Sequence, residues 1–169
     1  TQRGAEWSTI SGPGYPVNVT IQNGTTVEIT NSVVTDYGIQ GDLNIGDAVN
    51  GEGTLIMTNV SNYLQVGGDV NIGAGATAGS LTLSSTFGGD IRLSGNWYNN
   101  VNGSFSPNGR AVFFNGGADQ TINKFGASTV EVFDYLIIDN SWGNVVIGAN
   151  TTEIDCRGSN GGDALSLIN

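Results

Sequence analysis

The side chains of this chain that could do chemistry are carboxylates, amides and a few aromatic rings, because the sequence contains no His. Without imidazole, the chain has no His-based acid–base catalysis, no Ser–His triad and no His-ligated metal. The single cysteine, Cys156, has no His to activate it and no second cysteine to pair with. Its spacing from Ile154 predicts a small thiol that faces the same way as that Ile.

The acidic residues that could form a catalytic group lie in one C-terminal stretch: Glu131, Asp134, Asp139, Glu153 and Asp155. Enzymes that cleave polysaccharides need a pair of carboxyl groups held close together. Asp134 and Asp139 are an odd number of residues apart, so a continuous strand would direct them to opposite faces. The favoured interpretation is that all five are solvated polar positions, and no catalytic residue is assigned.

Carboxylates also recur at corners that look equivalent. Asp42, Asp69 and Asp90 each follow a glycine and precede a short alternating strand. If stacked, they would form a column of carboxylates that repel one another unless a cation such as Ca²⁺ intervened. The favoured interpretation is that each Asp caps a turn through backbone N–H groups. No cofactor is therefore expected, with calcium at these three residues as the alternative.

Three aromatic residues in polar segments, Trp97, Tyr98 and Trp142, are candidates for sugar binding. Tyr and Trp offer a broad apolar ring together with a polar group, which suits them to stacking on a carbohydrate. The favoured interpretation is that these rings cover the apolar edge of a coil, with sugar binding as the alternative. A carbohydrate-binding module is therefore one of the functions that the sequence leaves open.

The composition excludes several other classes. The net charge is −10, with only five basic residues, which argues against nucleic acid as a partner. No apolar run is long enough to span a membrane as a helix, so no membrane insertion is expected. Asn, Gly, Thr and Ser together make up close to half of the chain, which argues against helical bundles.

Apolar residues alternate with polar ones in many runs of four to six residues, from 17–21 to 145–147. Turn-forming Gly, Asn and Asp separate the runs, which is typical of short, half-buried β-strands. No stretch shows a helical period. The residues expected to face inward in the central runs are Val70, Ile72, Leu81, Leu83, Ile91 and Leu93.

The strands also repeat. The string GDLNIG at 41–46 returns as GDVNIG at 68–73 and as GDIRLSG at 89–95. Self-similarity at periods of 20–50 residues is typical of solenoids. We therefore predict a right-handed parallel β-helix, with an immunoglobulin-like β-sandwich as the alternative. The expected organisation is one domain over 1–169, with an N-terminal cap at 1–16 and stacked coils from about 17 to 169 that continue beyond the chain end.

Residues 95–122 read GNWYNNVNGSFSPNGRAVFFNGGADQTI. This string resembles a repeated element of large exported cell-surface proteins of Bacteroidota, and the segments VNVTIQNGTTVEI and LQVGGDVNIG are similar to other parts of such domains. The resemblance implies a β-helical segment of an adhesin-like protein secreted by the type IX system. It implies an extracellular or cell-surface location, a longer parent chain, and surface glycans or other cell-surface proteins as partners.

From these observations we expect a non-catalytic structural or adhesive segment that acts as a stiff stalk or scaffold. A carbohydrate-binding module is the first alternative, and a polysaccharide-degrading β-helix enzyme is the second.

Overall fold

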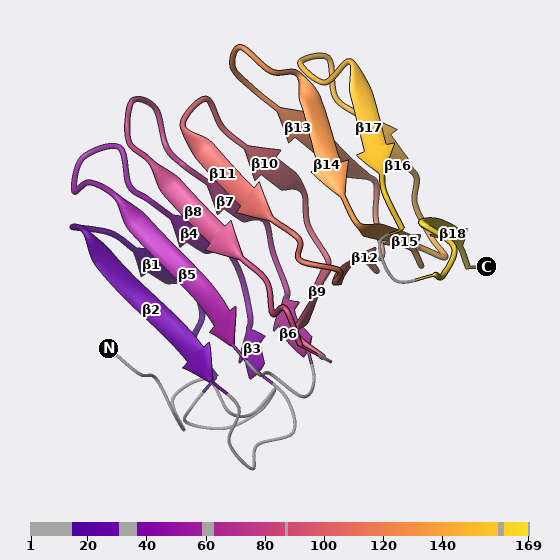
Figure 1. Cartoon of the computed structure of the whole chain (residues 1–169), viewed down its shortest axis with the longest axis horizontal. Helices are drawn as coiled ribbons and strands as arrows, with labels where there is room; N and C mark the ends of the chain where they lie inside the picture. Colours follow the sequence, from indigo (N-terminus) through magenta and orange to yellow (C-terminus); the bar gives the residue numbers. More distant parts are fainter. Residues whose placement is uncertain (1–14, 31–36, 59–62, 87, 159–160, 169) are drawn as a thin grey trace.

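The computed structural model describes residues 15–30, 37–58, 63–86, 88–158 and 161–168. Within these ranges the chain forms 18 β-strands and no helix (Figure 1). The expected N-terminal cap, residues 1–16, lies outside the described residues except for Tyr15 and Pro16.

The strands are arranged in sheets whose order advances by three strands at each step. The first sheet contains β1 (Val19–Ile21), β4 (Leu43–Ile45), β7 (Val70–Ile72), β10 (Trp97–Asn99), β13 (Gln120–Lys124) and β16 (Val145–Ile147). The second contains β2 (Thr25–Thr30), β5 (Gly53–Thr58), β8 (Gly79–Thr82) and β11 (Gly103–Ser106), and is followed by a separate pair, β14 (Val130–Phe133) and β17 (Glu153–Cys156). The third contains β3 (Tyr37–Ile39), β6 (Tyr63–Val66), β9 (Asp90–Leu93), β12 (Ala111–Phe114), β15 (Tyr135–Ile138) and β18 (Leu165–Leu167).

Every one of these strand pairs is parallel. The chain is therefore a β-solenoid, as the repeats predict, in which three short strands make each coil and successive coils stack (Figure 1). The immunoglobulin-like sandwich is wrong, because its neighbouring strands would be joined in antiparallel hairpins.

The core is the narrow interior of the solenoid, where side chains of successive coils stack in columns. The six residues that alternation places inward in the central coils are all buried: Val70, Ile72, Leu81, Leu83, Ile91 and Leu93. Burial is lost at both ends of the stack, where Val17 is 65% exposed and Ile147 is 53% exposed. Both positions continue the alternation of β1 and β16, which are the outermost strands of the first sheet in the described part of the chain.

The third copy of the Gly-Asp motif is not equivalent to the first two. Asp42 and Asp69 precede β4 and β7 of the first sheet, whereas Asp90 begins β9 of the third sheet. The structural equivalent of Asp42 and Asp69 in the next coil is Asn96, which precedes Trp97 in the register of β7 with β10. The same local string, a glycine turn followed by a short strand, therefore serves two different corners.

The second sheet is interrupted. β11 pairs with β8, and β14 pairs with β17, but no ladder joins β11 to β14. The first and third sheets continue past this point through the β10–β13 and β12–β15 pairs. We call this break between β11 and β14 the seam (Figure 1).

Candidate functional site

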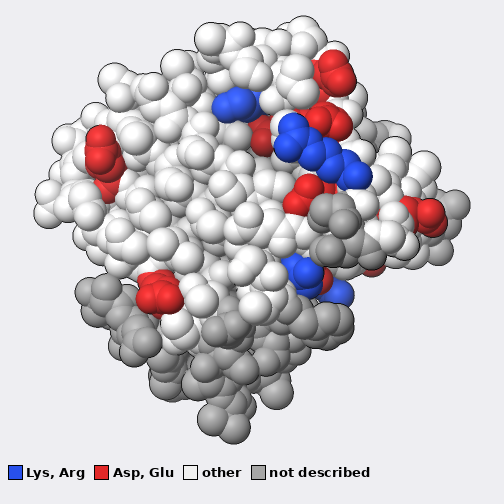
Figure 2. All heavy atoms as spheres, viewed as in Figure 1, with Lys and Arg blue, Asp and Glu red and all other residues white. Residues whose placement is uncertain are grey.

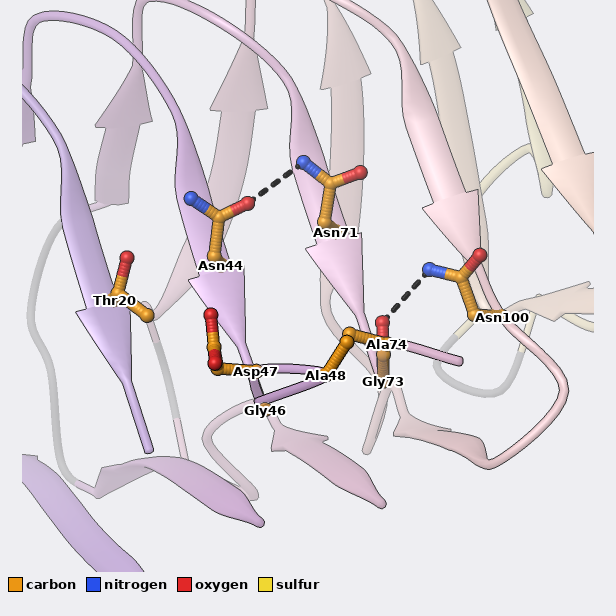
Figure 3. Close-up of a pocket in the computed structure, with 9 residues that line it drawn as sticks. All are labelled: Thr20, Asn44, Gly46, Asp47, Ala48, Asn71, Gly73, Ala74 and Asn100. Atoms are coloured by element: carbon orange, nitrogen blue, oxygen red, sulfur yellow. Dashed lines mark hydrogen bonds between the residues drawn. The ribbon is translucent and has the colours of Figure 1, made fainter. Parts of the chain in front are cut away.

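The outer face of the first sheet carries a polar hollow of about 480 Å³ (Figure 3). It lies over β4 and β7, beside the loops that follow these strands. Small and polar residues line it: Thr20, Asn44, Gly46, Asp47, Ala48, Asn71, Gly73, Ala74 and Asn100.

Strand alternation supplies the floor of the hollow. Thr20, Asn44 and Asn71 are the middle residues of β1, β4 and β7, and the parallel register places them side by side. Asn71 Nδ2 donates a hydrogen bond to Asn44 Oδ1 at 3.0 Å, so the two amides are held in one orientation (Figure 3). The next residue in this row is Tyr98 of β10. The row therefore runs from a hydroxyl through two amides to a phenol.

The loops after β4 and β7 supply the wall. The first loop closes with an antiparallel bridge between Asp47 and Gly51. Gly46 begins that loop with a φ of 87°. A Cβ on Gly46 would lie 2.7 Å from the carbonyl oxygen of Ala78, in the loop of the next coil. Glycine is therefore required where the two loops stack.

Asp47 is the ionisable side chain of the lining. Its Oδ1 accepts hydrogen bonds from the backbone N–H groups of Val49, at 2.9 Å, and Asn50, at 2.7 Å, and from Asn50 Nδ2, at 2.9 Å. These bonds, with the Asn50 N–H first, lower the pKa of Asp47. The carboxylate is therefore ionised at neutral pH and fixed at the rim.

The lining can bind hydroxyl-rich ligands through amide and hydroxyl groups, which both donate and accept hydrogen bonds. It contains one carboxylate, whereas glycoside hydrolysis uses two on either side of the scissile bond.

The sequence motifs did not single out this hollow. Asn44 and Asn71 occupy the same place in the GDLNIG and GDVNIG repeats, and this repetition was the one feature of the sequence that could have indicated a shared site. Thr20 and Asp47 could not be added to them without knowing which strands stack.

The aspartates that were candidates for calcium bind backbone N–H groups instead. Asn18 Oδ1 accepts from the Asp42 N–H, Asp42 Oδ1 from the Asp69 N–H and Asp69 Oδ1 from the Asn96 N–H, at 2.6–2.8 Å. Each side chain thereby caps the corner of the next coil, which agrees with the favoured interpretation.

Asp90 is not part of that column. It lies in the third sheet, where its Oδ1 accepts from the Ala111 N–H at 2.8 Å. Asp90 therefore does not stack with Asp42 and Asp69, and the single column of three aspartates considered for calcium is not formed. Among the residues that the structure describes, no three His, Cys, Asp or Glu side chains are grouped to hold a metal ion.

The three aromatic candidates do not form one platform. Trp97 is fully buried and packs edge-on against Phe105, with ring centroids 4.8 Å apart. Trp97 is an inward position of β10, in register with Val70, so its ring is not available to stack on a sugar and does not merely cover the edge of a coil. Trp142 is 85% exposed, in the loop before β16 and away from the hollow.

Tyr98 is the aromatic candidate that adjoins the hollow, since it is in register with Asn71. Burial, and then the charge of Asp69, raise the pKa of Tyr98. Its phenol therefore stays neutral at physiological pH and can both donate and accept a hydrogen bond.

The C-terminal carboxylates are not all solvated. Glu131 is only 2% exposed, which contradicts the expectation for this residue. In the run VEVF, Glu131 and Phe133 face inward, while Val130 and Val132 face outward. Asp134 is also buried, whereas Glu153 is exposed.

Charged side chains are sparse on the face of the molecule seen in Figure 2, and most of those in view lie toward the C-terminal coils. The second sheet presents one column of hydroxyl residues on its outer face: Thr26, Thr54, Ser80 and Ser104. The outer face of the second sheet therefore offers hydroxyl groups rather than the cations that a polyanion would need.

In the described part of the chain, no helix is long and apolar enough to cross a membrane. Comparison of the chain with protein-family models, curated proteins and solved structures gives no match.

Proposed function

We propose that this chain is a non-catalytic structural and adhesive segment of an exported cell-surface protein, in which the β-solenoid acts as a stiff scaffold. The observation that carries the proposal is the unbroken stacking of inward residues through successive coils, such as Leu43, Val70 and Trp97, all fully buried and in register. Repeated nearest-neighbour stacking of this kind gives an elongated body that cannot bend without breaking ladders.

The surface and the sequence add further support. Amide and hydroxyl groups outnumber charges on the outer faces, which gives solubility without strong electrostatic attraction. The resemblance of residues 95–122 to a repeated element of Bacteroidota surface proteins points to export and to an extracellular place of action. A type IX-secreted adhesin is the parent protein that fits these features.

Location and stiffness can be tested separately. An antibody raised against this segment should label intact cells of the source organism without permeabilisation. The purified chain should also resist a protease concentration that digests its Leu81→Ala variant, in which a core column is broken. Labelling only after lysis would contradict the proposed location, and equal digestion of both proteins would contradict the scaffold role.

A second candidate function is carbohydrate binding at the hollow, favoured by the row of Asn44, Asn71 and Tyr98. A neutral glycan lying along this row would hydrogen-bond the amides and stack on the phenol ring. A glycan array followed by calorimetry would test it. Asn71→Ala and Tyr98→Ala should each weaken binding at least tenfold, while Trp142→Ala, away from the hollow, should bind as the parent does. An array without a hit, or binding that only Trp142→Ala weakens, would reject the hollow.

A further inference from the structure

The seam is crossed by side-chain hydrogen bonds instead of a backbone ladder. Asn99 Nδ2, on β10, donates to Glu131 Oε1, on β14, at 3.1 Å. Lys124 Nζ donates to the Gly103 carbonyl at 3.4 Å, a long contact. These bonds join the coil of β10 and β11 to the coil of β13 and β14 at the point where the second sheet is open.

The bond between Asn99 and Glu131 lies inside the solenoid. Both side chains are 2% exposed, and the fully buried Trp97 adjoins them. Three buried atoms of this cluster have no hydrogen-bond partner: Trp97 Nε1, Asn99 Oδ1 and Glu131 Oε2. An unpaired polar atom in the buried interior destabilises the folded state. The protonation state of Glu131 decides how many of these three atoms stay unpaired.

A neutral carboxyl group supplies the donor that the cluster lacks. If Glu131 carries a proton on Oε2, that O–H can donate to Asn99 Oδ1, while Oε1 accepts from Asn99 Nδ2 and retains a lone pair for Trp97 Nε1. An ionised carboxylate only accepts, so Asn99 Oδ1 would stay unpaired. The ionised form would also place a charge in the apolar interior.

We propose that Glu131 is held as a neutral acid at the seam, where it pairs with Asn99 through two hydrogen bonds, and that its ionisation loosens the contact between the coils on either side. The seam is then a pH-sensitive joint within the scaffold, closed in the acid form of Glu131 and weakened in the carboxylate form.

The groups around Glu131 that favour its ionised form offset the effect of burial only in part. Burial raises the pKa of Glu131, while the Asn99 hydrogen bond, the charge of Lys124 and weaker contributions from Trp97 and the Val132 N–H lower it, with burial the largest effect. Lys124 is the facing cation from β13, yet it forms no ion pair with Glu131 within the described residues.

The remaining titratable groups near Glu131 are Asp134, just after β14, and those of β17, which include the Cys156 thiol in register with Phe133. Asp134 follows β14 and accepts a hydrogen bond from the Gly109 N–H. Glu153 and Asp155 alternate outward on β17, opposite Val130 and Val132.

The sign of the pH dependence follows from the raised pKa. The folded chain keeps the Glu131 proton at pH values where the unfolded chain has lost it. The contribution of this group to stability is therefore complete below the ordinary pKa of 4.5 and is lost as the pH rises through the folded-state pKa.

The test compares Glu131→Gln with the parent, since Gln keeps the shape and the donor of the neutral acid but cannot ionise. Denaturant unfolding from about pH 5 to about pH 8, below the titration of Cys156, should show a midpoint that falls with pH in the parent and falls much less in Glu131→Gln. Glu153→Gln, an exposed change on the adjacent strand, should keep the slope of the parent. A parent slope that survives in Glu131→Gln would overturn the proposal.

Infrared spectroscopy of the parent gives a second readout that does not depend on a variant folding. A protonated carboxyl stretch should persist in the parent at pH values above the ordinary pKa of 4.5, where exposed carboxyl groups have ionised. If Glu131→Gln folds, the band should be missing from it. If the parent loses all carboxyl absorption together with its exposed carboxyl groups as the pH passes 4.5, Glu131 has no raised pKa and the proposal is overturned.

Discussion

Asp42 Oδ1 accepts a hydrogen bond from the backbone N–H of Asp69 at 2.8 Å, across 27 residues and from one coil to the next. The same relation joins Asp69 to Asn96 at 2.6 Å. These side chains supply an acceptor for a corner N–H that lies beyond the ends of the strands. The column is therefore part of what stacks the coils.

Loss of this acceptor should weaken stacking by one hydrogen bond. Asp42→Ala should lower the free energy of unfolding by about 1 kcal/mol, the typical net contribution of such a bond. Asp42→Asn, which keeps an acceptor oxygen, should lie closer to the parent. Chemical denaturation measures both, and an alanine variant as stable as the parent would show that the cap contributes nothing.

Chelation should leave the thermal stability unchanged, because the Asp42 and Asp69 side chains bind N–H groups. Melting with EDTA and with added calcium should give midpoints within a degree or two of each other by ligand linkage. A drop of many degrees in EDTA that calcium restores would contradict this assignment of the corners.

Core truncation should be costly along the columns, including at Trp97. Ile91→Ala should cost about 2–5 kcal/mol and Trp97→Ala about 3–5 kcal/mol, because both side chains are fully buried. A ring that only covered the edge of a coil would cost less. Denaturant unfolding of the two variants decides between these, and a Trp97→Ala cost below 1 kcal/mol would contradict the buried position.

Arg92 should matter more than an exposed side chain. It alternates outward on β9, but its guanidinium lies 4.3 Å from the ring centre of Tyr63 and 4.6 Å from that of Phe113, on the neighbouring strands. Arg92→Ala should therefore cost about 1 kcal/mol through lost cation–π contacts. A double-mutant cycle with Tyr63→Leu should show coupling, and additive effects would mean that the stacking is not stabilising.

Cys156 should react slowly with thiol reagents. Burial, and then the charge of Asp155, raise its pKa above the ordinary 9.0, which keeps it as the thiol at neutral pH. Modification by a thiol-reactive chromophore should be many times slower in the native than in the unfolded chain. Equal rates would show that the thiol is open to solvent and unperturbed.

The alternation of apolar residues predicted the strands, the inward columns and the β-solenoid, because each short strand reports its own faces. It could not decide the run VEVF, where either Val130 and Val132 or Glu131 and Phe133 could face inward. The packing of Phe133 on Trp97, with ring centroids 5.6 Å apart, fills the interior at that level. Glu131 is two residues from Phe133 on the same strand, so its carboxyl group also faces inward.

The hollow could not be predicted for a different reason. It is made by residues far apart in sequence, and their meeting depends on which coils are stacked and in what register. Asn44 and Asn71 can be recognised as equivalent residues of a repeat. The loop that contains Asp47 lines the hollow because Gly46, which has no Cβ, allows it to pack on the loop of the next coil. The buried position of Trp97 was not predicted, because the neighbouring turn-forming residues indicate a loop, whereas Trp97 begins strand β10 and faces the interior.

Forced unfolding of single molecules, pulled between residues 15 and 168, tests the scaffold role most directly. Coil starts in the first sheet are 23–27 residues apart, so peeling one coil should release about 85 Å of chain. Because each coil is held by its nearest neighbours, we expect a series of such steps. A single low-force event that releases the whole chain at once would contradict a stiff structural segment.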